Sequence, residues 1–481
     1  MQATLRQAAV RQGWNVAEWV TRHPLAIGVP VMLVLLVAIY AQSAGLRASR
    51  GASITGDEPF YLLTTRSLLD DRNLDLRAQY ELRSYTAFFD HPDGLWMQSL
   101  PMEDGRLLSP HNPGLSVLLI PGFAWGGLAG VQAQLLLTAA LTFALTYVLV
   151  AKLTGAPLAS WLATLAVALT ATAFIYATEV YPELPAALVL VGALLLVTGD
   201  ARLGVGRALA LVVLLSAMAW LGIKYAPLIG LVGGYALVRA ENRGRVVLAV
   251  AGAAWAGLYV WFQLRTFGAL TPYSVNVVWA GDSTVAVVEA HVNVVDRIYR
   301  LWGLFIDRRF GVARWAPILF LALAGCIPLL RQRGLPRLIL ALIAAQLLIA
   351  TFVAITMVGW WFPGRTLVTV LPLFALPLAV LLRDGRPWLR LTAAGLGAYS
   401  ALITLHLARA GHAGELTIAV DPFRLQALPF QRLSWLFPQY TAWGADTWLL
   451  TAAWLAAGAV MFALLWQRRG GREQGIGNRE Q

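Results

Sequence analysis

Long apolar runs without charged residues recur along the whole chain of 481 residues, and short polar gaps separate them. Several runs approach the ~20 residues that an α-helix needs to cross the hydrocarbon core of a bilayer. The pattern predicts twelve candidate spans, at residues 25–46, 128–151, 157–178, 184–200, 208–222, 225–238, 246–264, 315–330, 338–358, 366–382, 391–408 and 447–466. Two of them, 208–222 and 225–238, are short and meet at Lys224, which predicts a helical hairpin with a shallow outer tip.

The composition supports this interpretation, because 58% of the residues are hydrophobic, only 13% are charged, and the mean hydropathy is +0.65. A soluble domain has roughly 45–50% apolar and about 25% charged residues. Too little polar surface remains to cover a water-exposed particle, so we expect an all-α polytopic membrane protein that forms one domain, 1–481. The run 25–46 is longer than the apolar region of a signal peptide and is interpreted as an uncleaved first span. The single cysteine, Cys326, excludes an intramolecular disulfide.

The net charge is +12, but the basic residues gather in the gaps between apolar runs, so we expect no nucleic-acid partner. If the N-terminus is cytosolic, every short inner gap is basic, which is the positive-inside pattern of membrane proteins. The inner basic residues are then Lys152, Arg202, Arg207, Arg239, Arg243, Arg245, Arg331, Arg333, Arg337, Arg383, Arg386 and Arg390. Twelve spans would place both termini in the cytosol, and the membrane would be the inner (plasma) membrane of the cell.

In this topology 19 of the 25 Asp and Glu residues lie on the outer side, and ten of them lie between Gly51 and Asn112. The first outer loop, 47–127, is therefore acidic, and its stretch 61–69 has the spacing of an amphipathic helix that lies on the membrane. Two more outer loops, 265–314 and 409–446, are rich in aromatic residues. We expect the chemistry of the protein on this outer face.

The first candidate site is Thr55-Gly56-Asp57-Glu58-Pro59-Phe60-Tyr61, just beyond the first span. Thr55 and Glu58 have the spacing of a helix-capping box, with Pro59 early in the helix. Capping accounts for the helix start, and Asp57 would then favour the helix dipole. Alternatively, a carboxylate at the outer surface can act as a general base on a hydroxyl, which makes Asp57 and Glu58 the candidate catalytic residues.

The second candidate site is the turn Ser109-Pro110-His111-Asn112-Pro113-Gly114-Leu115, in which prolines flank His111 and Asn112. Proline restricts the residue before it to extended conformations, so the turn is expected to be extended. The simplest interpretation is a junction between a loop and a helix. Alternatively, a hydrogen-bond donor at this position, here His111, can contact a phosphate at the membrane surface.

A third acidic motif, Thr178-Glu179-Val180-Tyr181-Pro182-Glu183, connects the third and fourth candidate spans. Carboxylates at this depth are costly unless they face protein or water, so Glu179 and Glu183 are either functional or part of a solvated turn. The outer cations Lys224 and Arg365 either snorkel to the interface or bind a lipid-linked phosphate.

Other site types find no support in the sequence. Asp90-His91-Pro92-Asp93 contains ligands for a hard cation, but one short cluster is more typical of a solvated loop. A glycine loop with Lys-Ser/Thr and a GxSxG motif are both absent from the sequence. We therefore predict no metal site and no cofactor.

The order of these motifs resembles the GT-C superfamily of membrane glycosyltransferases, in particular the protein O-mannosyltransferases (glycosyltransferase family 39) and the lipid A aminoarabinose transferases. The resemblance rests on Gly56-Asp57-Glu58 through Leu76, Pro110–Gly127, Phe305–Gly311 followed by Trp315-Ala316-Pro317, and Pro363-Gly364-Arg365. It implies a GT-C fold, Asp57 as catalytic base, and Glu179 or Glu183 as the second acid that orients the acceptor. The family often has Lys or Arg beside the outer-loop prolines, where this chain has His111.

The sequence therefore predicts a GT-C enzyme that transfers a hexosyl or pentosyl group from a polyprenyl-phosphate donor to a hydroxyl of a protein, glycan or lipid. The reaction would take place on the non-cytosolic face with inversion at the anomeric carbon, as the resemblance implies. Arg365, Lys224 and His111 would bind the donor phosphate. The alternatives are a secondary transporter or lipid-linked sugar flippase of about twelve spans, and a non-catalytic lipid-binding subunit.

Overall fold

The computed structural model describes residues 23–199, 201–276, 294–428 and 430–467, which contain α-helices, short 3-10 helices and one isolated β-bridge, Leu203 to Ala240. The longer helices are α3 (Pro24–Tyr40), α4 (Glu58–Asp70), α6 (Gly114–Thr154), α7 (Pro157–Ala168), α9 (Glu183–Leu196), α10 (Val205–Leu221), α11 (Ala226–Arg239), α12 (Asn242–Phe267), α17 (Ile318–Leu329), α18 (Leu335–Phe352), α19 (Ala375–Asp384), α20 (Pro387–His412) and α21 (Ala445–Gln467). The shorter ones are η1 (Ala41–Ser43), α5 (Arg77–Glu81), η2 (Ser84–Ala87), α8 (Ala171–Tyr176), η3 (Ile223–Tyr225), η4 (Pro272–Val275), α15 (Arg300–Ile306), α16 (Val312–Trp315), η5 (Arg365–Leu367), η6 (Leu371–Phe374), η7 (Pro422–Arg424) and η8 (Ser434–Leu436).

Every apolar run named from the sequence contains at least one of these helices, which confirms the all-α polytopic prediction. Six helical segments of the described chain are long and apolar enough to cross a membrane: Pro24–Ser43, Gly114–Thr154, Asn242–Val275, Leu335–Phe352, Pro387–His412 and Ala445–Trp466. The other apolar helices are shorter than a full span, so the number twelve stays a prediction. The two chain ends, for which the sequence predicts a cytosolic position, lie outside the described residues.

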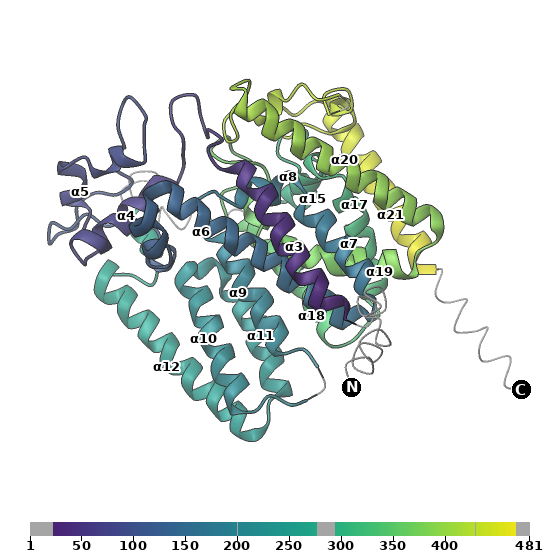
Figure 1. The fold of residues 1–481 in the computed structure, drawn as a ribbon, viewed down its shortest axis with the longest axis horizontal. Coiled ribbons are helices and arrows are strands. Elements are labelled where there is room, and N and C mark those ends of the chain that lie inside the picture. The colour runs from purple at the N-terminus through teal and green to yellow at the C-terminus, as the bar shows by residue number, and fades with distance from the viewer. Residues whose placement is uncertain (1–22, 200, 277–293, 429, 468–481) are drawn as a thin grey trace, which may run out of the picture.

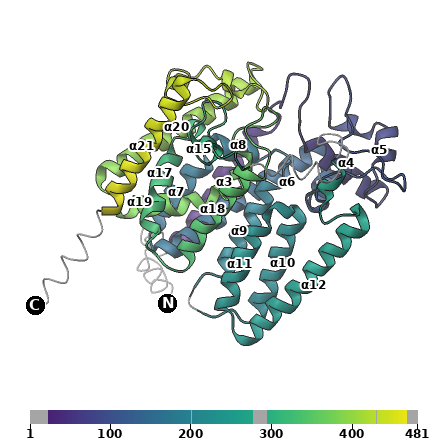
Figure 2. The same ribbon diagram turned by 180° about the vertical axis from the view of Figure 1, so that it is seen from behind.

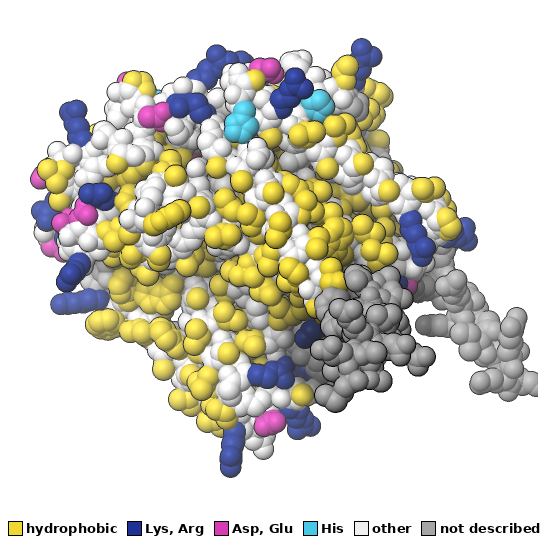
Figure 3. All heavy atoms as spheres, in the orientation of Figure 1, with side chains coloured by type: hydrophobic (Ala, Val, Ile, Leu, Met, Phe, Trp, Pro, Cys, Tyr) yellow, Lys and Arg dark blue, Asp and Glu magenta, His cyan; other side chains and the backbone are white. Residues whose placement is uncertain are grey.

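The helices form two groups that meet at α6 (Figures 1 and 2). Helices α9, α10, α11 and α12 lie together, and α6 packs against both α9 and α3. Helices α7, α17, α19, α20 and α21 lie on the other side, while α4 and α5 project at one end. On the face drawn in Figure 3, hydrophobic side chains cover the middle, and charged side chains gather toward the two ends. A belt of this kind is what a bilayer requires of a spanning protein.

The candidate span 157–178 is not one continuous helix, which corrects the sequence-based expectation. It divides into α7 and α8 at Leu169 and Thr170, and the Thr170 hydroxyl accepts a hydrogen bond from the N–H of Ala173. The carbonyls released by the break are bonded: Tyr40 donates to Ala168 and Thr404 donates to Leu169. Broken helices persist inside membranes when neighbouring side chains satisfy the freed backbone groups in this way.

A second break interrupts the candidate span 366–382, in which the 3-10 helices η5 and η6 precede α19. Both breaks lie where the chain approaches the same interior region, since Thr172 after the first break donates a hydrogen bond to the carbonyl of Pro363. The segments that follow the first break and precede the second carry the Glu179–Glu183 motif and Arg365. The breaks therefore bring short, non-helical backbone with polar side chains to one place.

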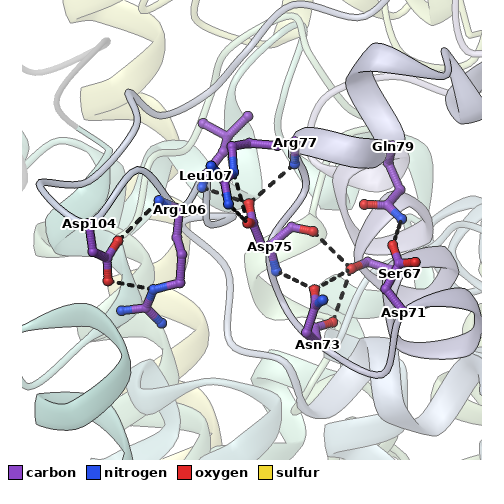
Figure 4. Close-up of polar contacts among 9 residues, drawn as sticks. All are labelled: Ser67, Asp71, Asn73, Asp75, Arg77, Gln79, Asp104, Arg106 and Leu107. Atoms are coloured by element: carbon purple, nitrogen blue, oxygen red, sulfur yellow. Dashed lines mark hydrogen bonds and ion pairs between the residues drawn. The ribbon is translucent and has the colours of Figure 1, made fainter.

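The predicted helix within 61–69 is present as part of α4, and the rest of the first outer loop folds over it. The side chains from Glu58 to Thr65 are all buried, because α6, α5 and η2 pack around the helix. Asp75 organises the covering loop (Figure 4): its Oδ1 accepts the N–H of Leu107 at 2.9 Å, and its Oδ2 pairs with Arg77 at 2.7 Å. A backbone hydrogen bond from the N–H of Leu76 to the carbonyl of Leu107 adds to this contact and fixes the segment that leads to His111.

The two later outer loops are joined through a buried carboxylate. Asp307 Oδ1 accepts the N–H groups of Arg309 and Phe310, and its Oδ2 accepts the N–H of Tyr440 at 3.0 Å. Part of the first of these loops, residues 277–293, lies outside the described chain. The Asp307 contacts nevertheless tie the described end of that loop to residues of the predicted loop 409–446.

Candidate active site

One cavity of about 970 Å³ lies where the first outer loop meets the helix ends of the bundle. The start of α4, the turn 110–112, the tip between α10 and α11, and η4 contribute to its wall. The end of α18 and the segment 360–366 complete it. Apolar side chains form most of the lining at the tip of the helical hairpin and at the end of α18: Leu221, Ile223, Pro227, Ile349, Val353, Ala354, Ile355 and Val358.

Asp57 lies at the N-terminus of α4 and lines this cavity. Gly56 before it has φ +61°, a conformation that favours glycine, and a Cβ on Gly56 would also lie 2.7 Å from the hydroxyl oxygen of Tyr181. Asp57 Oδ2 accepts a hydrogen bond from Arg365 Nη2 at 2.7 Å. Burial opposes the charge of Asp57, but the charges of Arg365 and His111 outweigh it and lower the pKa of Asp57 to about 2.

Arg365 lies far from Asp57 in the sequence, but it too follows a glycine with a positive φ angle. Gly364 before it has φ +92°, and a Cβ there would collide with Val312 and Thr172. The guanidinium donates through Nε to Glu183 Oε1 at 3.2 Å and lies over the Tyr181 ring at 3.8 Å. Its side chain is only 8% exposed, so Arg365 is a buried cation with two carboxylate partners.

Lys224, at the tip between α10 and α11, completes the charged cluster. Its Nζ lies 2.6 Å from Glu183 Oε1, the oxygen that Arg365 also contacts. The Lys224 side chain is 30% exposed, whereas that of Glu183 is 1% exposed. Two carboxylates, Asp57 and Glu183, thus face two cations in one cavity wall, and the four charges balance.

His111 lies beside this cluster, in a bend of the chain at residues 110–111. Its Nε2 is 2.8 Å from Gln98 Oε1 and 3.8 Å from Asp57 Oδ1. Its ring packs against that of Tyr61, with 4.7 Å between ring centroids and an angle of 30° between the ring planes. Burial lowers the pKa of His111, although the charge of Asp57 opposes the shift.

Glu58 and Glu179, two further candidate residues, are not among the described residues that line the cavity. Glu58 Oε1 accepts the N–H of Thr55 at 3.0 Å, and Oε2 accepts the N–H of Val180 at 2.9 Å. Burial raises the pKa of Glu58 to about 7 against the lowering effect of these bonds. Burial and the charge of Glu58 also raise the pKa of Glu179 well above its usual range.

The capping box is therefore half formed. Glu58 reaches back to the N–H of Thr55, as the box requires, but α4 begins after Asp57, and no side chain caps its N-terminus. The second oxygen of Glu58 bonds instead to Val180, which is distant in the sequence. Glu58 thus joins the first outer loop to the Glu179–Glu183 motif.

Asn112 is a cavity residue that the sequence motif contained but that was not among the predicted site residues. Its Oδ1 accepts hydrogen bonds from the Tyr259 hydroxyl at 3.1 Å and from Gln263 Nε2 at 3.3 Å. Both donors belong to α12, which the sequence identified only as a candidate span. Tyr259 and Gln263 lie one helical turn apart inside this apolar run, and this polar pair could have indicated a buried polar contact.

The fold and the cavity define a class, a polytopic membrane protein with the GT-C fold, as the sequence predicted. A particular protein is similar to it: the crystal structure of ArnT from Cupriavidus metallidurans in the apo state matches with a TM-score of 0.50 and 14% sequence identity, over 92% of this chain and 72% of that chain. The structure of that ArnT bound to undecaprenyl phosphate matches with a TM-score of 0.45 and 14% identity, over 92% of this chain and 78% of that one. The sequence matches no family model and no curated protein.

Proposed function

We propose that the protein is a glycosyltransferase that moves a hexosyl or pentosyl group from a polyprenyl-phosphate donor to an acceptor hydroxyl. The observation that carries this proposal is a charged cluster in the wall of one largely apolar cavity, in which Arg365 pairs with Asp57 and Lys224 pairs with Glu183. The GT-C fold shared with ArnT supports the same reaction class. An apolar cavity with a few convergent charged groups is the usual form of a ligand site.

The apolar end of the cavity suits the isoprenoid part of the donor, and the charged end suits its phosphate. Arg365 can contact two phosphate oxygens together, and Lys224 adds a second positive charge. In the reaction, the donor phosphate leaves as a monoester and gains one negative charge. Cations placed where this charge develops stabilise the transition state, and such stabilisation is usually the largest single contribution to the rate.

Asp57 is the proposed general base. The acceptor oxygen forms a bond to the anomeric carbon, its proton passes to a carboxylate oxygen of Asp57, and the bond between the anomeric carbon and the phosphate oxygen breaks with both electrons leaving on the phosphate. Of the described cavity carboxylates, the second, Glu183, is engaged by both cations. This arrangement supports a single displacement with inversion, in which Glu183 positions the cations. No metal or other cofactor enters the proposed reaction.

We further propose that the cavity opens to the outer face of the cell inner membrane. The basic inner gaps support this orientation by the positive-inside rule. A cysteine in place of the exposed Asp93, in a chain whose Cys326 is replaced by alanine, should react with a membrane-impermeant maleimide added outside intact cells. Labelling of this position only after the cells are opened would contradict the orientation.

The reaction itself is tested with purified full-length protein and radiolabelled polyprenyl-phosphate sugars. A mixture of cell-envelope acceptors should become labelled with one neutral or amino sugar of the panel, and free polyprenyl phosphate should be released in equal amount. Release of labelled free sugar without transfer would indicate a hydrolase. Movement of intact donor across proteoliposomes without release of polyprenyl phosphate would favour a flippase instead.

A further inference from the structure

Arg365 contacts the proposed base in the structure and is also assigned to the donor phosphate in the proposed reaction. In the structure its Nη2 bonds to Asp57, the proposed base, at 2.7 Å. The proposed reaction, however, assigns this guanidinium to the donor phosphate. One N–H edge of Arg365 cannot bond to the carboxylate and to a phosphate at the same place, so the two partners compete.

The rest of the guanidinium is held without help from Asp57. Its Nε bonds to Glu183 at 3.2 Å, and its carbon lies 3.8 Å from the ring centroid of Tyr181 and 4.6 Å from that of Trp361. These contacts can remain when the Nη2 edge changes partner. The Lys224 ammonium on the same Glu183 oxygen supplies a second charge beside the exchange position.

We propose that the donor phosphate displaces Asp57 from Arg365, so that the base is released for proton transfer only when the donor is bound. This inference rests on the proposed function and adds a control to its site. A phosphate presents two oxygens to the guanidinium, as a carboxylate does, and can take over the same bond. Without donor, the carboxylate stays bound to the cation and does not activate the acceptor or a water molecule.

The protonation behaviour of Asp57 agrees with this exchange. Burial by itself would raise the pKa of Asp57. Charged neighbours, of which Arg365 has the strongest effect, lower this pKa to about 2. General bases work best when their pKa lies near the operating pH. Loss of the hydrogen bond from Arg365 removes one lowering contribution, and the negative charge of the bound phosphate offsets the charge of Arg365. Burial remains, so the pKa of Asp57 rises and the carboxylate becomes a stronger base when the donor is bound.

The exchange makes an unusual prediction for ligand binding. Removing the charge of the base should tighten the binding of the donor phosphate, because Asp57 no longer competes for Arg365. The probe is farnesyl phosphate, with farnesol as its uncharged counterpart, added to the full chain in detergent and measured by calorimetry. We expect Asp57→Asn to lower the Kd for farnesyl phosphate roughly fivefold or more, in the range of typical couplings between linked ligands. Farnesol binding and the matched acid-to-amide control Asp93→Asn should show no such change.

A double-mutant cycle separates the exchange from simple repulsion between two negative charges. If Asp57 acts through Arg365, the tightening disappears when Asp57→Asn is added to Arg365→Gln. If it acts by general repulsion, the same tightening remains in that background, and the exchange is wrong. Should Arg365→Gln fail to give a monodisperse protein, Arg365→Lys serves as the background. Lysine cannot hold Glu183 and a second acid through one planar group, so the tightening should shrink there as well.

The binding experiment uses no sugar, so its result is distinct from that of the transfer assay. An equal Kd for the wild type and Asp57→Asn contradicts the exchange and leaves the proposed glycosyl transfer intact. A wild-type chain that binds farnesyl phosphate no better than farnesol contradicts the proposed donor, and the exchange with it.

Discussion

Each of the two acidic motifs, Asp57-Glu58 and Glu179–Glu183, contains two carboxylates that have different surroundings in the fold. Asp57 and Glu183 face the cavity and contact cations, with 2.7 Å between Asp57 and Arg365 and 2.6 Å between Glu183 and Lys224. Glu58 and Glu179 are buried beside them but do not line the cavity. Each of the two acidic motifs thus supplies one carboxylate to the cavity and one to the interior behind it.

The difference shows that the partner, and not the residue type, decides the state of a carboxylate. Asp57 meets a guanidinium, and its pKa is lowered to about 2 despite burial. Glu58 meets two backbone N–H groups and no direct cation, and burial raises its pKa to about 7. Asp57 is thus held by a cation that a phosphate can take over, whereas Glu58 links two loops through backbone hydrogen bonds.

The largest expected effect is on turnover, and it distinguishes the two members of the first motif. Asp57→Asn keeps the shape of the side chain but removes the charge that accepts a proton, so transfer should fall by about 10²–10⁴, the usual contribution of a general base. Glu58→Gln should retain at least a tenth of wild-type turnover at pH 6, because Glu58 does not line the cavity. Initial rates of sugar transfer by folded, monodisperse protein check both. Wild-type rates for Asp57→Asn would remove the basis of the proposed mechanism.

The second effect concerns the cation that Asp57 contacts. Arg365→Lys keeps the charge but loses the planar fork, so kcat/KM for the donor should fall by about 10–10², in line with the strength of a charge-assisted bidentate contact. Arg106→Lys is the matched control, since Arg106 pairs with Asp104 on the exposed first outer loop. Equal losses for the two variants would show that the cavity position of Arg365 has no special role.

The third effect is a pH dependence of stability that originates in Glu58. Its folded-state pKa of about 7 lies above its ordinary value of 4.5, so its contribution to stability is complete below pH 4.5 and is lost as the pH rises through 7. The loss should reach at most about 3 kcal/mol, and Glu58→Gln should remove this part of the pH dependence, while the raised pKa of Glu179 leaves its own part in place. Thermal unfolding from pH 5 to 8 measures the slope. Asp57 does not contribute in this window, because its lowered pKa affects stability only as the pH falls below 3.8.

The smallest expected effect concerns the uncharged cavity residue Asn112 and its hydrogen bonds to α12. Tyr259→Phe removes one of the two donors to Asn112 and should cost about 1 kcal/mol, the usual net value of a hydrogen bond. The released Asn112 amide should also raise KM for the donor two- to threefold. Tyr235→Phe removes a comparable contact to Arg239, away from the cavity, and should lower thermal stability without changing KM. A KM that is unchanged in Tyr259→Phe would show that the orientation of Asn112 does not matter.

Much of the fold could be predicted because the bilayer imposes a simple requirement on the sequence. Apolar runs near span length mark helices, and each such run contains one. The break at Thr170 could not be predicted, since it depends on hydroxyl groups of distant helices that satisfy the freed carbonyls, as Tyr40 and Thr404 do. The break before α19 likewise has a distant donor, the Gln346 amide, which bonds to the carbonyl of Thr366. The burial of α4 was missed for a similar reason, because the loop that covers it follows later in the chain.

The sequence by itself determined that the protein is a helical membrane protein and that its acids and outer cations are concentrated in a few short motifs. Only the tertiary structure decided which of them meet: Asp57 and Arg365 are 308 positions apart, yet they form one ion pair. It also separated Asp57 from Glu58, although they are adjacent. The physical reason is that hydrophobic periodicity is a local property of the chain, whereas the partner of a buried charge is set by the packing of the whole bundle.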